Sequence, residues 1–137
     1  GIDYSFNIIL GCGGAELWRE NADATAALIN AVQPHLLFIG TLHAEPGCRL
    51  YQDMKKGLFK ECTFGQLLDE QERLISGLDL KNTIYFGSHP SNIVPMQGRL
   101  PKHKQAMIEA VHEKREQLRR HLDEYPQRGG EGSILNR

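Results

Sequence analysis

Short apolar runs that alternate with helical patterns are the feature that most constrains the fold of this 137-residue chain. Residues 4–10 and 35–42 each contain an uninterrupted apolar stretch, which is typical of a parallel strand buried on both faces. Residues 82–87 read as a third strand. Between these runs, residues 16–32 and a segment that begins at Thr63 carry apolar residues at helical spacing. The order strand, helix, strand, helix, strand predicts two βαβ units around a parallel sheet.

Apolar stripes indicate which face of each helix should pack on the sheet. In residues 16–32 the stripe consists of Leu17, Ala24, Leu28 and Ala31. The second helix follows a capping-box pattern at Thr63-Phe64-Gly65-Gln66, and its stripe consists of Leu67, Leu74, Ile75 and Leu78. A last helix is expected from Pro101 to about residue 122, with a stripe of Ile108, Val111, Arg115, Leu118 and Leu122. The handedness of βαβ crossovers places the first two helices on one face of the sheet.

The remaining segments are expected to be less regular. Residues 48–62 have a mixed composition that predicts at most a short helix, and residues 88–101 read as a polar loop with three prolines. The glycine-rich residues 126–137 predict a disordered tail. The expected fold class is therefore α/β, with residues 1–125 forming a three-stranded parallel βαβαβ fragment of a partial TIM-type barrel plus a C-terminal helix.

Three strands are too few to close a barrel, so two sheet edges and the inner face of the sheet should remain open. Exposed edges and apolar faces favour pairing with another chain, which predicts a homo-oligomer. The alternative is a monomer in which the last helix folds over the open face. The chain also enters its first apolar run almost directly after Gly1, without a methionine. This start predicts that an N-terminal part of the same polypeptide is missing.

Composition excludes several classes of function. With 16 basic and 17 acidic residues, the chain offers no charge pattern for nucleic acid or for an acidic membrane surface. No apolar run approaches the roughly 20 residues of a membrane helix, and no signal peptide is visible. The three cysteines, Cys12, Cys48 and Cys62, are widely spaced, which argues against a secreted disulfide framework and against a metal site. A cytoplasmic protein without a bound metal is expected.

A glycine-rich turn follows the first strand and opens the first helix, at Gly11-Cys12-Gly13-Gly14. Glycine lets the backbone approach a ligand closely, so the peptide N–H groups of this turn are candidates for contact with a cofactor. A turn that merely needs positive φ angles would have the same composition. The sequence leaves these two interpretations about equal.

His89 lies in the segment Ser88-His89-Pro90-Ser91-Asn92, directly after the third strand. Ligand sites of α/β barrels lie at the carboxyl ends of the strands, so His89 is a candidate for contact with a substrate or a cofactor. The simpler interpretation, which we favour for a single histidine, is that it stabilises the loop through hydrogen bonds.

The run Ile8-Ile9-Leu10-Gly11-Cys12-Gly13-Gly14 is also similar to the first motif of S-adenosylmethionine-dependent methyltransferases. Those enzymes usually carry an acidic residue within the first strand, where this chain has Ile9, and another at the end of the second strand. The second strand here ends in Ile39-Gly40-Thr41-Leu42. The methyltransferase is therefore a distant alternative.

Taken together, three segments resemble the C-terminal half of a radical SAM enzyme of the Fe–S oxidoreductase subgroup. The first, Ile9-Leu10-Gly11-Cys12-Gly13-Gly14-Ala15-Glu16, is similar to the motif that lies against the adenine of S-adenosylmethionine. The second runs from Thr41 to Tyr51 and is similar to the stretch after the sixth strand. The third, Ser88-His89-Pro90-Ser91-Asn92 with Pro95, Gly98, Leu100 and Pro101, is similar to the end of the catalytic domain.

The resemblance covers roughly residues 4–112 and implies a set of cofactor contacts. A full-length relative would hold a 4Fe–4S iron–sulfur cluster and S-adenosylmethionine, and would cleave the sulfonium reductively to a 5′-deoxyadenosyl radical. The residues it implies at the cofactor are Ile9, Gly11, Cys12, Gly13, Gly14, Ser88 and His89. Asn7 stands where the family usually has the first glycine of its adenine motif.

The C-x3-C-x2-C loop that binds the cluster in this family is not found in the chain. We therefore expect an enzyme fragment that supplies part of the adenine-side and substrate-side wall, binds no cofactor by itself and is inactive alone. The alternative from another class is a stand-alone half-barrel module for binding or interaction. If the parent reading frame continues upstream and encodes the cysteine loop, the enzyme-fragment hypothesis is correct and the stand-alone module is excluded.

Overall fold

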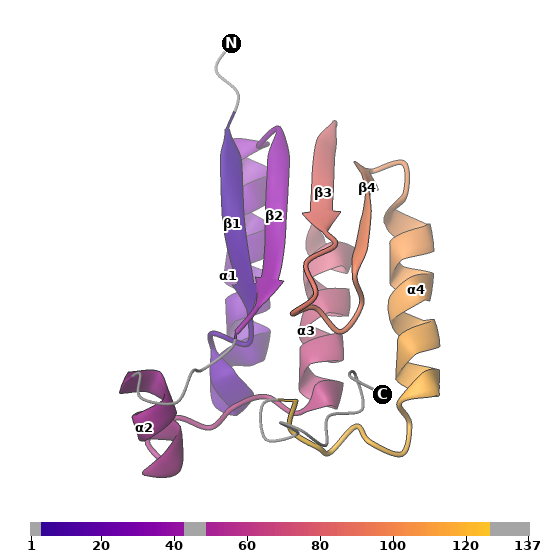
Figure 1. Cartoon of the computed structure of the whole chain (residues 1–137). Coiled ribbons are helices and arrows are strands. Elements are labelled where there is room, and N and C mark those ends of the chain that lie inside the picture. The colour runs from indigo at the N-terminus through magenta and orange to yellow at the C-terminus, as the bar shows by residue number, and fades with distance from the viewer. Residues whose placement is uncertain (1–3, 43–48, 127–137) are drawn as a thin grey trace.

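The computed structural model describes residues 4–42 and 49–126, without the side chains of Leu50 and Tyr51. The chain is an α/β protein with one mixed sheet beside a layer of helices (Figure 1). Its elements in order are β1 (Ser5–Leu10), α1 (Gly14–Val32), β2 (Leu36–Thr41), α2 (Arg49–Lys55), α3 (Phe64–Gly77), β3 (Thr83–Gly87), β4 (Met96–Leu100) and α4 (Lys104–Gln117). The tail expected to be disordered, apart from Pro126, lies outside the described residues.

The sheet has four strands in the order β1-β2-β3-β4. β1 pairs in parallel with β2, and β2 pairs in parallel with β3, whereas β3 and β4 are antiparallel. The α/β class is confirmed, but the expectation of a three-stranded, wholly parallel sheet is wrong. The polar segment after β3 folds back and adds a strand to that edge.

β4 has a weak sequence pattern, and the composition of residues 88–101, with three prolines, predicts a loop instead. In this Met-Gln-Gly-Arg-Leu strand only Leu100 is fully buried. Its pairing with β3, in which Thr83 lies opposite Leu100 and Gly87 opposite Met96, supplies the hydrogen bonds that make it a strand. Such pairing with a distant segment is not visible in local composition.

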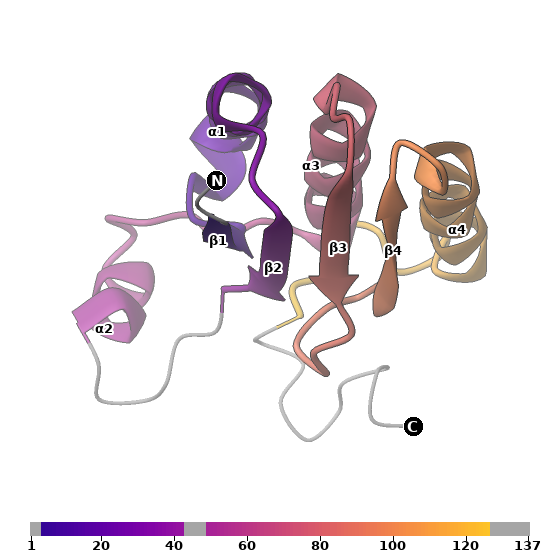
Figure 2. The same ribbon diagram turned by 90° about the horizontal axis from the view of Figure 1, so that it is seen from above.

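The helices α1, α3 and α4 lie on one face of the sheet, which is clear when the molecule is seen from above (Figure 2). α3 is the central helix and packs against α1 on one side and α4 on the other. The expected capping box is confirmed, because the Thr63 side chain accepts from the Gln66 N–H and the Gln66 side chain accepts from the Thr63 N–H. The expected α3 stripe of Leu67, Leu74, Ile75 and Leu78 is buried.

The stripe expected for α1 is wrong. Leu17 and Leu28 are each 58% exposed, and the buried face of the helix consists of Ala22, Ala26 and Ile29. Both sets of residues have helical spacing, so periodicity alone could not choose between them. The small alanines lie where α1 packs closely on α3, as the 3.2 Å approach of the Ala26 Cβ to a Cβ built on Gly77 indicates.

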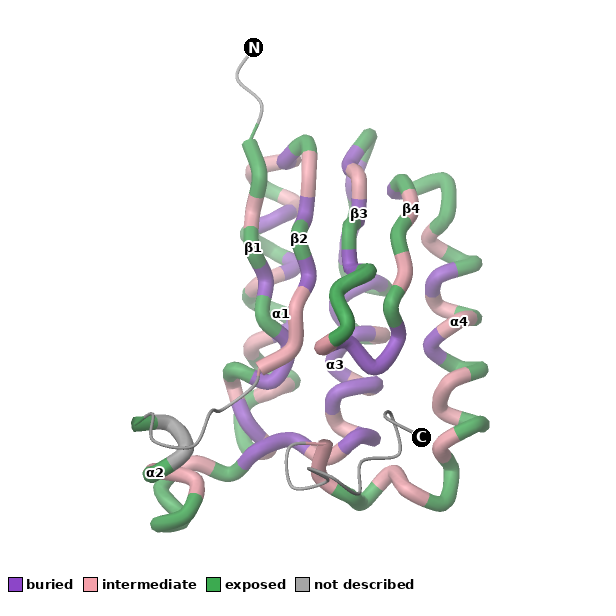
Figure 3. The backbone as a smooth tube through the Cα atoms, in the orientation of Figure 1, coloured by how far each residue is buried: buried purple, intermediate pink, exposed green. Residues whose placement is uncertain are grey.

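The opposite face of the sheet carries no helix within residues 4–42 and 49–126 (Figures 2 and 3). In the three parallel strands, alternate residues are exposed or partly exposed there, including Ile9 at 41%, Phe38 at 41% and Phe86 at 42%. The alternative in which the last helix covers this face is wrong, because α4 packs beside α3 and β4 on the other side. We call this uncovered surface the open face.

Candidate functional site

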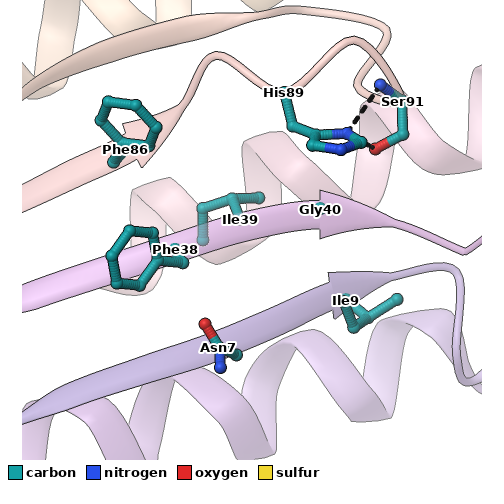
Figure 4. A pocket seen from close by; sticks show the side chains of 8 residues that line it. All are labelled: Asn7, Ile9, Phe38, Ile39, Gly40, Phe86, His89 and Ser91. Atoms are coloured by element: carbon teal, nitrogen blue, oxygen red, sulfur yellow. Dashed lines mark hydrogen bonds between the residues drawn. The ribbon is translucent and has the colours of Figure 1, made fainter.

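A pocket of about 420 Å³ lies on the open face, at the carboxyl ends of the parallel strands (Figure 4). The side chains that line it come from β1, from β2, from the end of β3 and from the loop that follows β3. They are Asn7, Ile9, Phe38, Ile39, Gly40, Phe86, His89 and Ser91. The pocket therefore lies at the edge of a parallel sheet where α/β proteins usually bind ligands.

Sheet register creates the apolar part of the pocket. Asn7 lies opposite Phe38, and Phe38 lies opposite Phe86, so these side chains form one row across three strands. The two phenyl rings meet edge to face, with centroids 6.0 Å apart and an interplanar angle of 70°. In the next exposed position along the sheet, Ile9 lies opposite Gly40, whose missing side chain leaves space between Ile9 and Ser91. Apolar side chains thus form the floor of the pocket, next to the position where Gly40 has no side chain.

A buried asparagine fixes the polar end of the pocket. Asn92 is 2% exposed, and its amide nitrogen donates to the carbonyl of Ile39 at 2.9 Å and to that of Gly87 at 2.8 Å. Its amide oxygen accepts from the Thr41 hydroxyl at 2.8 Å. One side chain thus ties the ends of β2 and β3 to the loop that carries His89 and Ser91, so the loop is held in a single position.

His89 and Ser91 form a hydrogen-bonded pair in this loop. The Ser91 N–H donates to Nδ1 of His89 at 3.0 Å, and the Ser91 Oγ lies 2.8 Å from the same nitrogen. The Thr41 N–H in turn donates to Ser91 Oγ at 3.3 Å. The loop-stabilising hydrogen bonds favoured for His89 are therefore present, and the same side chain also lines the pocket.

The glycine-rich turn lies apart from this pocket, and several of its amides already have partners in the protein. The Gly11 N–H donates to the Glu70 carboxylate at 2.9 Å, the Gly14 N–H to the Gly11 carbonyl at 3.0 Å and the Ala15 N–H to the Lys60 carbonyl at 2.8 Å. Gly11 and Gly14 have φ angles of 92° and 69°. The turn is thus of the kind that needs positive φ, with Gly13 in the ordinary helical region.

The residues proposed from sequence fall into two groups. Ile9 and His89 line the pocket, and Ser88 is exposed beside His89. Gly11, Gly13 and Gly14 do not line it. Cys12 lies instead in a second groove of about 390 Å³, between the free edge of β1 and α1. The structure therefore does not bring the seven residues into one site.

The glycine turn lies beside the buried Glu70 carboxyl and the buried Cys62 thiol, and it contains the exposed Cys12. Burial raises the pKa of the Glu70 carboxyl, although its hydrogen bonds from Gly11 and Asn21 act in the opposite direction. Burial, helped by the charge of Glu70, raises the pKa of the Cys12 thiol and raises that of Cys62 to about 12. Thiols of this kind stay protonated near neutral pH and are poor nucleophiles and poor metal ligands.

The described part of the chain contains no group of three or more His, Cys, Asp or Glu side chains that could hold a metal ion. Cys48 and His43, which belong to the second segment of the family resemblance, lie outside the described residues. Within residues 4–42 and 49–126, no helix is long and apolar enough to cross a membrane.

Sequence reasoning missed the two phenylalanines, Asn7 and Ser91 as pocket residues. The strand count predicted an open inner face, but the sequence reasoning did not decide which residues of each strand point to it. Once one face is known to be open, the two-residue period of a strand identifies Asn7, Ile9, Phe38 and Phe86 directly.

Comparison with models of known protein families, with curated proteins and with solved structures found no match to this chain. Functional assignment therefore depends on the pocket and on the motifs in the sequence.

Proposed function

We propose that this chain is the C-terminal part of a radical SAM barrel, and that its open face supplies a wall of the cavity that holds S-adenosylmethionine and substrate. The observation that carries the proposal is the pocket at the carboxyl ends of three parallel strands, on a sheet whose described helices cover only the other face. In a closed barrel the same face points inward and the helices form the outer ring.

The exposed side chains of the open face support this proposal. Ile9, Phe38 and Phe86 are large apolar residues that would be covered by the opposite wall of a barrel. Isolated exposed apolar residues are common, but three large ones gathered on adjacent strands of one face indicate a surface built to be covered. Ile9, one of the residues placed at the cofactor by the family resemblance, lies next to the Phe38 and Phe86 row and lines the same pocket.

The described residues fit the adenosyl part of the cofactor but not the cluster. A flat base can lie on the Phe38 and Ile9 side chains, with Asn7 and His89 as polar contacts. By contrast, Cys12 and Cys62 have raised thiol pKa values and belong to no ligand group within the described residues. When bound, S-adenosylmethionine and a cluster would supply the radical chemistry, and this chain would orient the ligand and exclude water.

The parent reading frame provides the first test. An upstream extension that carries a C-x3-C-x2-C loop supports the proposal, and a complete frame without such a loop overturns it. The second test uses the extended protein with its cluster reconstituted and measures S-adenosylmethionine binding by calorimetry. Phe38→Ala should weaken binding by about tenfold, because it removes an apolar contact surface. The control is Leu17→Ala, an exposed leucine on α1, which should leave the affinity unchanged.

A stand-alone binding module remains the second candidate, and β4 is the observation that favours it. β4 pairs with the edge of β3 that a larger parallel barrel would extend, and α4 packs against β4, the last strand of the described sheet. In this case the pocket would bind a small ligand without radical chemistry. The methyltransferase alternative gains no support from the glycine turn, because the N–H groups of Gly11, Gly14 and Ala15 are bonded within the protein.

A further inference from the structure

The hydrogen bonds of His89 determine which of its ring nitrogens carries the proton. A backbone N–H can only donate, so Nδ1 must be the acceptor of the 3.0 Å bond from the Ser91 N–H. A neutral imidazole with an unprotonated Nδ1 carries its hydrogen on Nε2. The Ser91 hydroxyl, 2.8 Å away, can then only share the single lone pair of Nδ1 as a second donor.

The neighbours of Ser91 hold this arrangement in place. Ser91 Oγ accepts the Thr41 N–H at 3.3 Å, which holds the hydroxyl group beside Nδ1 of His89. Asn92, the adjacent residue, is anchored to β2 and β3 through the carbonyls of Ile39 and Gly87. The ring of His89 is therefore oriented from one side only, and Nε2–H has no protein acceptor among the described residues.

The rest of the pocket limits the ligand that this donor can meet. The other lining side chains are apolar or uncharged, and no Asp, Glu, Lys or Arg is among them (Figure 4). An anionic group placed against Phe38 and Phe86 would lose hydration without gaining an ionic partner. A flat aromatic ring, by contrast, packs well on phenyl edges and faces.

From these contacts we infer that the pocket selects a neutral planar ring that carries a hydrogen-bond acceptor, and that Nε2–H of His89 is the donor to this acceptor. The inference rests on the proposed function only in that both use the same pocket. It specifies a chemical preference that holds whether the chain is part of a radical SAM barrel or a module of its own.

The test uses two soluble bicyclic probes of the same shape, quinolinemethanol and naphthalenemethanol, which differ in one ring nitrogen. Dissociation constants are measured by NMR titration of the full chain, with the amides of Gly40 and Ser91 as reporters. In His89→Asn the side-chain oxygen can replace Nδ1 as the acceptor for Ser91, but no group replaces Nε2–H. The preference for the quinoline should fall by roughly two- to tenfold, the value of one hydrogen bond. In His89→Gln, whose amide nitrogen can take the place of Nε2, a part of the preference should return.

Two further measurements protect this test from effects of misfolding and of charge. Nitrogen-15 shifts of the His89 ring in the unmodified chain should show the proton on Nε2, and a proton mainly on Nδ1 would overturn the inference. Naphthoate, an anion of similar shape, should bind more weakly than either neutral probe. Tighter naphthoate binding, no shift of the reporter amides with any probe, or an unchanged quinoline preference in His89→Asn would each refute it. None of these outcomes depends on the cysteine loop, so the proposed function can fail separately.

Discussion

The most informative perturbation is Asn92→Asp, which keeps the size of a buried side chain but removes both of its donors. Asn92 donates to the carbonyls of Ile39 and Gly87 at 2.9 and 2.8 Å, and accepts from the Thr41 hydroxyl at 2.8 Å. The introduced carboxyl still accepts from Thr41. It removes the Asn92 donors from two carbonyl oxygens and places a negative charge next to them.

The expected loss in the free energy of unfolding follows from the number of hydrogen bonds that the substitution removes. A buried polar group that loses its partner costs about 1–3 kcal/mol, so two such groups predict a loss of about 2–5 kcal/mol in the free energy of unfolding. The matched control is Thr41→Val, which removes only the hydroxyl group that donates a hydrogen bond to the Asn92 amide oxygen. It should cost about half as much as Asn92→Asp, because one buried acceptor loses its donor instead of two.

Urea unfolding followed by circular dichroism measures both variants against the unmodified chain. The deficit of Asn92→Asp should shrink as the pH falls, because a protonated carboxyl is uncharged and can donate once. A loss no larger than that of Thr41→Val, or a deficit that does not change with pH, would refute the view that Asn92 joins the ends of β2 and β3.

Four further predictions concern other parts of the chain. Because burial raises the pKa of the Glu70 carboxyl in the folded state, the free energy of unfolding should fall as the pH rises from about 4.5 through the raised value. Glu70→Gln should flatten this part of the pH profile, and equal slopes in urea titrations would contradict the assignment. Gly14→Ala should destabilise the chain by more than about 1–3 kcal/mol, since its φ is 69° and the new Cβ would lie 2.6 Å from the Lys60 carbonyl oxygen. Gly57 also has a positive φ, but a Cβ added there would meet no atom within 4 Å. Thermal melts of Gly57→Ala and Gly14→Ala therefore separate the cost of backbone strain from that of the clash. Anaerobic reconstitution with iron and sulfide should yield no stoichiometric 4Fe–4S cluster on this chain, and a broad charge-transfer absorption that any one cysteine substitution abolishes would disprove this. The chain should self-associate through the free edge of β1 and the open face, and light scattering after gel filtration that gives a single mass near 15.5 kDa would exclude it.

Some of these features could be predicted from local pattern alone. The three parallel strands were expected at residues 4–10, 35–42 and 82–87 and are found as β1, β2 and β3. The α3 helix was recognised from its capping box and its apolar stripe, because both signals lie within a few residues of each other. His89 was placed correctly at the carboxyl end of a strand, since βαβ connectivity alone decides which end the loop occupies.

Tertiary structure decided which face of each element is covered. Leu17 and Leu28 fit a helical stripe as well as Ala22 and Ile29 do, and only the close packing of α1 on α3 selects the second set. An open sheet face was expected from the strand count, but only the structure shows that Phe38 and Phe86 lie on that face and line its pocket.

The sequence by itself thus determined the α/β class, the positions of the parallel strands and the loop that carries His89, because these depend on contiguous apolar runs and on turn residues close in the chain. Only the tertiary structure decided the antiparallel strand β4, the buried face of α1 and the network in which Asn92 joins Ile39, Thr41 and Gly87. The physical reason is the same in each case. These features depend on hydrogen bonds and packing between segments distant in sequence, and residue periodicity within one segment carries no information about its partner.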